Sequence, residues 1–287
     1  MQLRGAWWTV AFVLPFASVP RVCLCAQAEA SPARDSTATL ADGPRPFVSR
    51  RDALILAGAL GATAAAAPFD HSIQHAFRAE DVLHSRGLQR TATALAFVGG
   101  PGPFVVSGTL YAAGEIVGSS RLAGLGISIT EGVVLAASLN GVVKGISGRA
   151  LPNATSAEPG DFSFGRGFHE GNGSFVSFPS GHTAAAFAAA AVVAQEVSTW
   201  KPAAARFVTP AVYSAASLVA MSRLYQNVHW ASDLPLGAAI GVWSGKTVVN
   251  WQHRHPRNWL FRRIVHLSAL PASTGLTVRG AFTLAAQ

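Results

Sequence analysis

The stretch Pro179-Ser180-Gly181-His182 combines a helix start, a permissive backbone position and a titratable side chain. The run of alanine and valine that follows it has no breaker, so it predicts a helix that Ser180 caps. The first turn of a helix carries free N–H groups and the positive end of the helix dipole, which both favour an anion. Gly181 lets a ligand approach the backbone closely, and His182 can exchange a proton near neutral pH. Taken alone, these four residues favour a capped helix with a surface histidine, so the rest of the chain must decide.

A second group of reactive side chains lies in the sequence SRLYQNVHWASD, residues 222–233. Arg223 is a permanent cation whose planar fork suits phosphate oxygens. His229 and Asp233 are four residues apart and would share one face of a helical turn. The carboxylate would then fix the tautomer of the imidazole and leave its other nitrogen free to attack. An isolated pair of this kind is more typical of a helix surface.

Six apolar segments could position these residues, and their length and Ala/Leu/Val content favour helices over strands. We therefore predict an all-α fold, a bundle of about six helices with the active site at one end. The segments are Ala53–Pro68, Thr91–Gly114, Leu122–Val143, Thr183–Val197, Phe207–Met221 and Leu234–Trp251. In an up-and-down bundle, the ends of segments three and five and the starts of four and six meet at the same end. That end would gather Lys144, Arg149, Ser180, Gly181, His182, Arg223, His229 and Asp233.

Two histidines, several cations and a helix N-terminus suit phosphate transfer. The cations would stabilise charge on the phosphate oxygens while one histidine attacks and the other protonates the leaving group. The sequence resembles the type 2 phosphatidic acid phosphatase / vanadium haloperoxidase superfamily. Its pattern is Lys-x6-Arg-Pro, then Pro-Ser-Gly-His, then Ser-Arg-x5-His-x3-Asp. The second and third parts match this chain at every fixed position.

The resemblance implies a role for each matching residue. His229 would form a phosphohistidine, Asp233 would orient it, and His182 would protonate the leaving alcohol. The residues implied to hold the phosphate are Lys144, Ser180, Gly181 and Arg223. The family needs no metal for hydrolysis, so no metal site and no cofactor are expected.

The first part of the family pattern departs from expectation, because Lys144 is followed by Leu151-Pro152 where an arginine should precede the proline. Losing one charge-stabilising donor at such a site costs on the order of a hundred- to a thousandfold in rate. Arg149, two residues earlier, or Arg166 in the glycine-rich loop could supply the missing cation. Replacement of each by alanine would test this, with phosphate release and vanadate inhibition as the readouts.

The composition limits the class of protein. Half of the 287 residues are hydrophobic, only 13% are charged, and the formal net charge is +8. The densest basic cluster follows the last apolar segment, which favours a membrane flank or a solvated tail over a nucleic-acid site. We therefore expect a phosphorylated lipid or small phosphate ester as the partner, with membrane association and no nucleic acid.

The chain divides into four parts. Residues 1–28 have a positive start, an apolar centre and a small-residue cleavage site, so they predict a signal peptide, or alternatively an N-terminal anchor. Both cysteines fall in this leader, so a mature chain would have no disulfide. Residues 29–52 are expected to be a linker, 53–252 the phosphatase-like helical domain, and 253–287 a basic tail in which residues 272–284 could form a short strand pair.

The location of the site follows from conflicting signals. A cleaved leader followed by six spanning segments would place the site in the cytoplasm. The basic stretches before Ala53 and after Trp251 instead predict that those ends are cytoplasmic and that the site is outside. We expect a cell-envelope protein, in the membrane with its site facing the periplasm or exterior, with a soluble periplasmic protein as the alternative.

The expected activity is that of a phosphoric monoester hydrolase of the type 2 phosphatidic acid phosphatase kind. It would hydrolyse phosphate monoesters or pyrophosphates, of lipids first of all, without a metal and through a phosphohistidine. The alternatives are a soluble, broad-specificity periplasmic acid phosphatase and a non-catalytic membrane or binding protein.

Overall fold

The computed structural model describes residues 49–154, 157–169, 173–255, 269–272 and 275–278. Within them the main helices are α1 (Arg50–Ala66), α4 (Arg86–Gly99), α5 (Gly102–Val117), α6 (Ser120–Ser147), α7 (Gly181–Trp200), α8 (Pro202–Tyr225) and α9 (Asp233–Arg254). Shorter pieces are α2 (Asp70–Phe77), α3 (Glu80–Leu83) and the 3₁₀ turns Ala67–Phe69 and Arg166–Phe168. The predicted all-α bundle is confirmed, and the main helices follow the six apolar segments.

The ends of the chain are described only in part. The predicted leader and most of the predicted linker lie outside the described residues, and the first helix begins at Arg50 rather than at residue 53. In the tail, β1 (Ala269–Ala272) and β2 (Gly275–Val278) pair antiparallel, slightly earlier than the expected strand pair.

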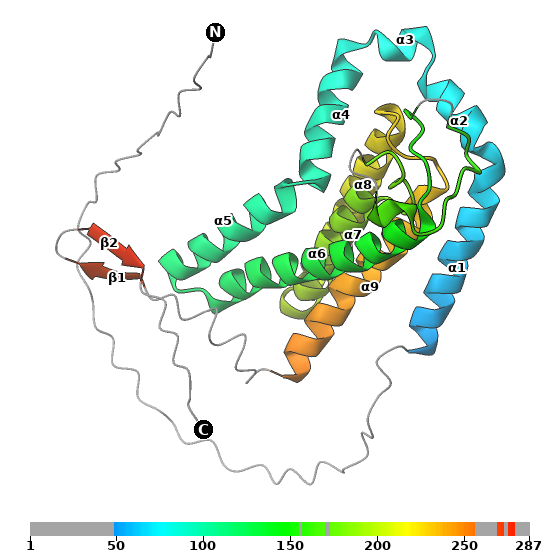
Figure 1. Ribbon diagram of the computed structural model, residues 1–287. Coiled ribbons are helices and arrows are strands. Elements are labelled where there is room, and N and C mark those ends of the chain that lie inside the picture. Colours follow the sequence, from blue (N-terminus) through cyan, green and yellow to red (C-terminus); the bar gives the residue numbers. More distant parts are fainter. Residues whose placement is uncertain (1–48, 155–156, 170–172, 256–268, 273–274, 279–287) are drawn as a thin grey trace. The chain divides into compact units, whose positions relative to one another are not determined.

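The second apolar segment differs from the prediction of one continuous helix. It is split into α4 and α5, which meet at a bend of 57° (Figure 1). The break falls at Gly99-Gly100-Pro101, where proline cannot donate the next helical hydrogen bond and the glycines weaken the helix. The bend places the C-terminal end of α4 against the start of α7, where the motif residues lie.

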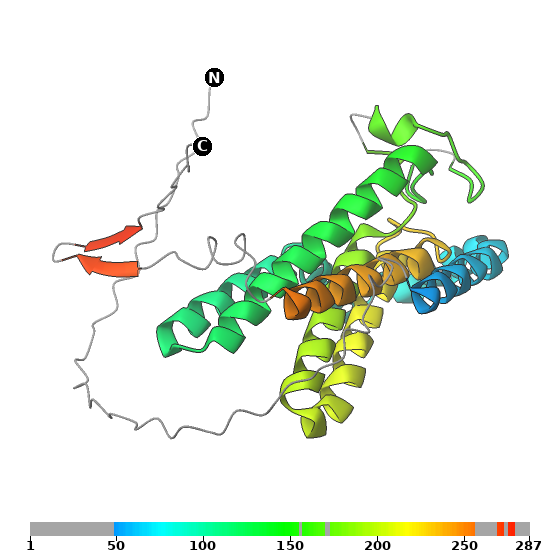
Figure 2. The same cartoon turned by 90° about the horizontal axis from the view of Figure 1, so that it is seen from below.

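Helix α7 lies at the centre of the bundle, between α6, α8 and α9 (Figure 1), while α5 and α6 run side by side (Figure 2). Gly237, Gly241 and Gly245 form a stripe along α9 that faces the backbone of α7. A Cβ atom built on Gly237 would lie 2.6 Å from the carbonyl oxygen of Ser180. These glycines therefore let α9 approach α7 closely, which fixes Asp233 beside the start of α7.

Three helical stretches of the described chain are long and apolar enough to cross a membrane: Arg50–Phe77, α6 and α8. The bent pair α4–α5 passes the same test if it counts as one span. Helices α7 and α9 are not among these candidates, and the main buried apolar cluster comes mostly from α6 and α7. The composition of the bundle therefore supports a membrane protein.

Candidate active site

His229 lies in the loop between α8 and α9, and Asp233 is the first residue of α9. Both side chains are buried, and Nδ1 of His229 lies 3.3 Å from Oδ2 of Asp233. The prediction that the pair shares a helical turn is wrong, because residues 226–232 form turns and bends. The two side chains still meet, because the backbone N–H of Trp230 donates to Asp233 Oδ2 at 2.8 Å and closes a tight turn.

The carboxylate of Asp233 accepts hydrogen bonds at both oxygens. Oδ2 also accepts from Ser177 Oγ at 2.5 Å, and Oδ1 accepts from Arg149 Nη1 at 2.6 Å. Burial favours a higher pKa, but the hydrogen bond and charge of His229, the charge of Arg149 and the Ser177 hydroxyl together lower the pKa of Asp233 below its ordinary value. Asp233 is therefore an ionised acceptor near neutral pH.

The imidazole of His229 is held in its neutral form. Burial lowers the pKa of its imidazole below the ordinary value, the hydrogen bond to Asp233 opposes this, and the charges of Lys144 and Arg223 lower it further. The ring is therefore neutral near pH 7. Because the carboxylate of Asp233 can only accept, Nδ1 carries the proton and Nε2 keeps its lone pair.

The start of α7 lies beside this pair. Ser180 caps the helix as predicted, with its hydroxyl accepting from the backbone N–H of Thr183, and its own N–H donates to the carbonyl oxygen of Asp233 at 3.0 Å. A Cβ atom on Gly181 would lie 3.7 Å from Cε of Lys144, so the lysine stem passes beneath the helix start. Lys144 Nζ donates to the carbonyls of Val176 and Ser177, which holds the ammonium next to that start.

Arg223 and His182 complete the cluster. Arg223 is 4% exposed near the end of α8, and its Nε has no hydrogen-bond partner among the described residues. Burial lowers the pKa of His182 to about 4, and the charges of Arg223, His229 and Lys144 contribute to the lowering. These mutual effects place the two histidines and the two cations within electrostatic reach of one another.

The bend between α4 and α5 contacts this cluster from the side. A Cβ atom on Gly100 would lie 3.1 Å from Nε2 of His182, and one on Gly99 would lie 3.2 Å from the His182 carbonyl. The missing side chains therefore leave room for the imidazole. The break in the second helix, which the sequence did not predict, supports a predicted site residue.

Arg149 does not lie where the sequence analysis expected it. All five N–H bonds of its guanidinium are directed at other acceptors. Nη1 donates to Asp233 and Ser232, Nη2 to Asp70 and the carbonyl of Pro159, and Nε to the same carbonyl. The guanidinium, with the side chain 3% exposed, thus lies behind Asp233 rather than facing a phosphate. The expectation that Arg149 replaces the missing motif cation is not supported by this geometry.

Arg166 remains the other expected source of the missing cation. It begins the exposed 3₁₀ turn in the loop between α6 and α7, and its guanidinium lies 3.7 Å from the ring centre of Phe175. Its role in phosphate binding stays a prediction.

Two polar residues of the site were missed by the sequence analysis. Ser177 donates to Asp233 and stands two residues before Pro179, so its nearness to the motif was a usable signal. Asp70, at the start of α2, binds Arg149 from more than seventy residues upstream, and no motif or spacing marks it.

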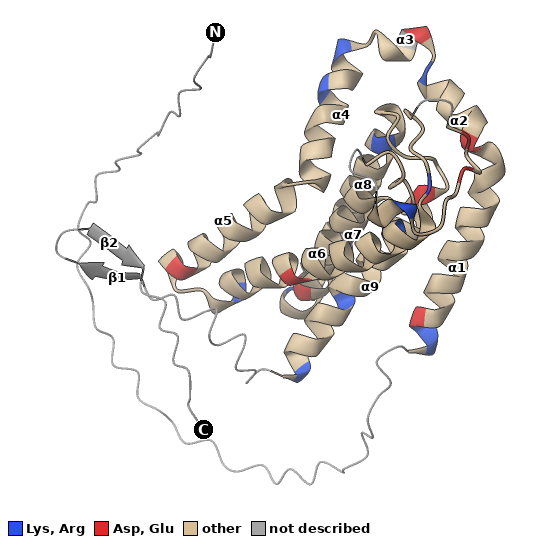
Figure 3. Ribbon diagram, viewed as in Figure 1, with Lys and Arg blue, Asp and Glu red and all other residues tan. Residues whose placement is uncertain are grey.

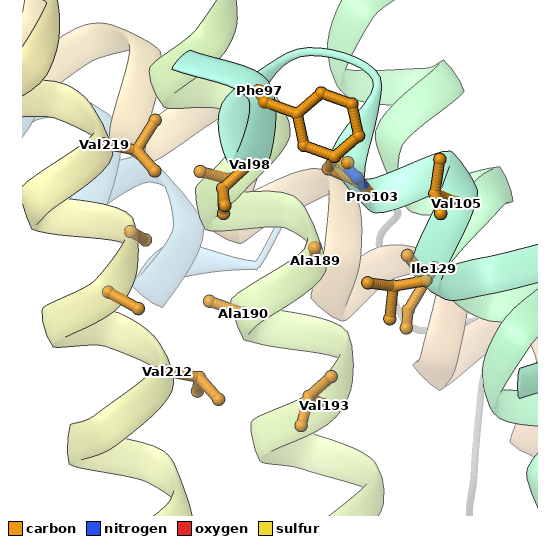
Figure 4. A pocket seen from close by; sticks show the side chains of 15 residues that line it. Phe97, Val98, Pro103, Val105, Ile129, Ala189, Ala190, Val193, Val212 and Val219 are labelled. Atoms are coloured by element: carbon orange, nitrogen blue, oxygen red, sulfur yellow. The ribbon is translucent and has the colours of Figure 1, made fainter. Parts of the chain in front are cut away.

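An apolar cavity of about 250 Å³ opens beside the bend, between α4, α5, α6, α7 and α8 (Figure 4). Phe97, Pro103, Ile129, Ala189 and Val219 are among the residues that line it. A Cβ atom on Gly99 would strike Cγ1 of Val219, and the same glycine contacts the backbone of His182. Gly99 therefore separates the cavity wall at Val219 from His182.

Among the residues that the structure describes, no group of three or more His, Cys, Asp or Glu side chains is placed to hold a metal ion. Metal independence itself stays a prediction.

Comparisons with known proteins bear on this arrangement. The model of the PAP2 superfamily matches residues 125–257. A lipid A 1-phosphatase of Porphyromonas gingivalis is 41% identical over 87 residues, which are 30% of this chain and 18% of that relative. The chain thus matches less than a fifth of the length of that curated relative.

A solved structure shares the fold. The crystal structure of a transmembrane PAP2 type phosphatidylglycerolphosphate phosphatase from Bacillus subtilis aligns with a TM-score of 0.53 and 21% identity. The alignment covers 72% of this chain and 96% of that one. All three motif regions, from Lys144 to Asp233, fall inside the residues that the family model matches. The resemblance drawn from the motifs is thereby confirmed: residues 125–257 match the model of the PAP2 superfamily, and the fold is that of a PAP2 type phosphatase.

Proposed function

We propose that this protein is a metal-independent lipid phosphatase that works through a phosphohistidine. The observation that carries the proposal is the buried His229, neutral and tied through Nδ1 to Asp233, beside a helix N-terminus and two cations. Nε2 of His229 attacks the phosphorus, the bond to the leaving oxygen breaks, and His182 supplies a proton to that oxygen. Water then attacks the phosphohistidine, gives up a proton to His182, and releases inorganic phosphate.

The protonation of His182 depends on the substrate. With its pKa lowered to about 4, the imidazole is neutral at pH 7 before a ligand binds. A phosphate group adds negative charge next to Arg223 and Lys144 and offsets their repulsion, which raises the pKa of His182. The acid for the leaving group is thus formed when the substrate arrives.

The cradle for the phosphate consists of the N-terminus of α7 at Ser180 and Gly181, with Lys144 and Arg223 beside it. Backbone N–H groups and the two cations would bind the equatorial oxygens and stabilise the charge that builds up on them. Arg223 Nε has no protein partner among the described residues, which supports a role in binding an anion.

A lipid is the favoured substrate class for two reasons. The apolar cavity, which Gly99 separates from His182, can take part of an acyl or prenyl chain, and three helical stretches of the described chain are apolar enough to cross a membrane. The relatives are named for acting on lipid A and on phosphatidylglycerolphosphate, which supports the same class.

The test is release of inorganic phosphate in detergent from phosphatidic acid, a polyprenyl pyrophosphate and an aryl phosphate, with and without EDTA. The native chain should release phosphate from a lipid in the presence of EDTA, and His229→Ala should release none. His84→Ala is the matched control, because His84 is a surface histidine that bonds its own helix backbone, so the activity should be retained. Brief incubation with labelled substrate should give an acid-labile, base-stable phosphoenzyme in the native chain and in His84→Ala but not in His229→Ala. Activity on the aryl phosphate but on neither lipid would favour the broad-specificity phosphatase, and no activity on any substrate would favour a non-catalytic protein.

We also propose that the site faces the periplasm or exterior. At the end of the bundle away from the site, the start of α6 and the ends of α7 and α9 share a pocket. Arg121, Lys201 and Arg254 stand at or next to these helix ends, and such positive flanks favour the cytoplasm. In a chain lacking Cys23 and Cys25, an impermeant maleimide should label Gly160→Cys, in the site loop, in intact cells and should not label Lys201→Cys. The reverse pattern would place the site in the cytoplasm.

A further inference from the structure

A buried ion network links Asp233 to Arg149 and Asp70. Asp70 is 1% exposed and accepts three hydrogen bonds. Oδ2 accepts from Arg149 Nη2 at 2.8 Å and from Ser232 Oγ at 2.6 Å, and Oδ1 accepts from the Ser232 N–H at 2.9 Å. Arg149 Nη1 donates in turn to Asp233 Oδ1 and to Ser232 Oγ. One guanidinium therefore bridges two buried carboxylates.

The geometry of this bridge depends on the fork of an arginine. Nη1 and Nη2 point to different carboxylates, while Nε and Nη2 share the carbonyl oxygen of Pro159. Because all five N–H donors are used, the guanidinium cannot turn without breaking several bonds. A lysine ammonium has no such planar fork and could not hold both carboxylates in the same orientation.

The network determines which oxygen of Asp233 accepts the hydrogen bond from His229. Arg149 occupies Oδ1, whereas Ser177, Trp230 and His229 donate to Oδ2. Were the guanidinium free to move, it would compete with the imidazole for the same carboxylate. Asp70 prevents this by holding the other half of the fork.

We propose that Asp70 is a positioning residue for the phosphatase reaction: it anchors Arg149, which fixes Asp233 so that one carboxylate oxygen remains for His229. This inference rests on the proposed function. Asp70 lies in α2, outside residues 125–257 that the family model matches, so a segment beyond that domain completes its active site.

Asp70 also affects the charge that His229 experiences. Attack on phosphorus turns the neutral ring of His229 into a cation, which Asp233 stabilises. Arg149 partly offsets the charge of Asp233, and Asp70 offsets that of Arg149. The other charged or titratable groups near His229 are Lys144, Arg223 and His182. Loss of the Asp70 charge makes this surrounding more positive, so it should lower the pKa of His229 and slow formation of the cationic phosphohistidine.

The decisive variant is Asp70→Asn, which keeps the shape but turns one acceptor into a donor facing Arg149. We expect kcat for an aryl phosphate to fall about ten- to a hundredfold, with KM unchanged, because Asp70 does not touch the substrate. We also expect the acid limb of the kcat–pH profile to move to lower pH. Asp161→Asn, an exposed carboxylate at the same end of the bundle, is the matched control and should behave as the native chain.

The outcomes separate positioning from a merely structural role. A folded Asp70→Asn chain with unchanged kcat, or with reduced kcat and an unmoved acid limb, would overturn the proposal. If Asp70→Asn does not fold, Ser232→Ala removes one hydrogen bond to Asp70 while keeping its charge, and an unchanged kcat in that variant would overturn the proposal as well. Activity that survives in His229→Ala would instead reject the proposed function, whatever Asp70→Asn does.

Discussion

The two sides of His229 are built in opposite ways. On the carboxylate side, which we call the closed side, Asp233, Arg149 and Asp70 form a set in which both carboxylates and every N–H of the guanidinium have partners. On the other side, which we call the open side, the donor Nε of Arg223 is buried and has no hydrogen-bond partner among the described residues. Figure 3 shows Lys, Arg, Asp and Glu gathered in the loops near the site and at helix ends, with few along the middles of the helices.

The closed side contributes to stability, whereas the open side carries a buried donor that costs stability. Buried charges that are fully hydrogen-bonded hold a structure in one arrangement, and breaking such a set costs several kcal/mol. A buried donor without a partner lowers stability, so its presence calls for a functional reason such as a ligand. Under the proposed function, the carboxylate side orients the nucleophile and Arg223 on the other side binds the anion.

The largest effect is expected from Asp233→Asn, which breaks the closed side. We expect kcat to fall about a thousand- to ten-thousandfold, because the amide no longer fixes the tautomer of His229. The variant should also lose about 3–5 kcal/mol of stability, because the buried Arg149 keeps its charge with one fewer carboxylate partner. Phosphate release and the thermal midpoint in detergent measure the two losses. A midpoint equal to that of the native chain would show that the closed side does not stabilise the fold.

Arg223→Gln tests the open side of the comparison. We expect a loss of about a hundred- to a thousandfold in kcat, because one donor to the developing charge is removed. The thermal midpoint should stay the same or rise, since the variant removes a buried charge whose Nε lacks a partner. Arg206→Gln on the same helix, an exposed residue whose guanidinium stacks on Phe207, should leave activity unchanged. A midpoint that falls as far as in Asp233→Asn would erase the distinction between the two sides.

The open and closed sides also differ in how well the sequence predicts them. The residues of the open side stand in contiguous motifs at helix ends, and helix periodicity was enough to bring them together. His182 and Arg223 lie at these ends because α7 begins at a capping serine and α8 ends before a tight turn. Local rules of capping and helix length therefore predicted the bundle and the nearness of these residues to one another, while their roles stay predictions.

The closed side depends on contacts that no local rule encodes. Asp70 meets Arg149 across 79 residues, so neither residue signals its partner in the sequence. Arg149 was expected to bind phosphate because it lies two residues before the motif position, but a place in the sequence cannot tell which way a side chain points. The bend at Pro101 was not predicted either. It brings Gly100 next to His182, and these two residues are far apart in the sequence.

A smaller effect is expected in the way that anion affinity on the open side depends on pH. His182 has its pKa lowered to about 4, so it is neutral between pH 5 and 7 before an anion binds. An anion raises that pKa, so binding takes up a proton and the affinity increases as the pH falls, by at most about tenfold per pH unit. Sulfate is the suitable probe, because its own charge does not change in this range.

Inhibition of aryl phosphate hydrolysis by sulfate, measured from pH 7 to pH 5, reports this affinity. His182→Asn should flatten the dependence, while Asp161→Asn should leave it as in the native chain. An affinity that is constant with pH in the native chain would mean that His182 does not respond to the anion.

The smallest effect is expected at Arg166, in the loop at the edge of the open side. Its contact with Phe175 is at an exposed position, where a cation–π interaction contributes about 0.5–1 kcal/mol. If Arg166 only orders this loop, Arg166→Ala should raise KM about two- to fivefold, as that energy implies, with kcat and vanadate inhibition nearly unchanged. A hundredfold fall in kcat together with loss of vanadate inhibition would instead give Arg166 the role of the cation that Leu151 cannot supply. The open side would then take its third cation from the loop, while Arg149 would still belong to the closed side.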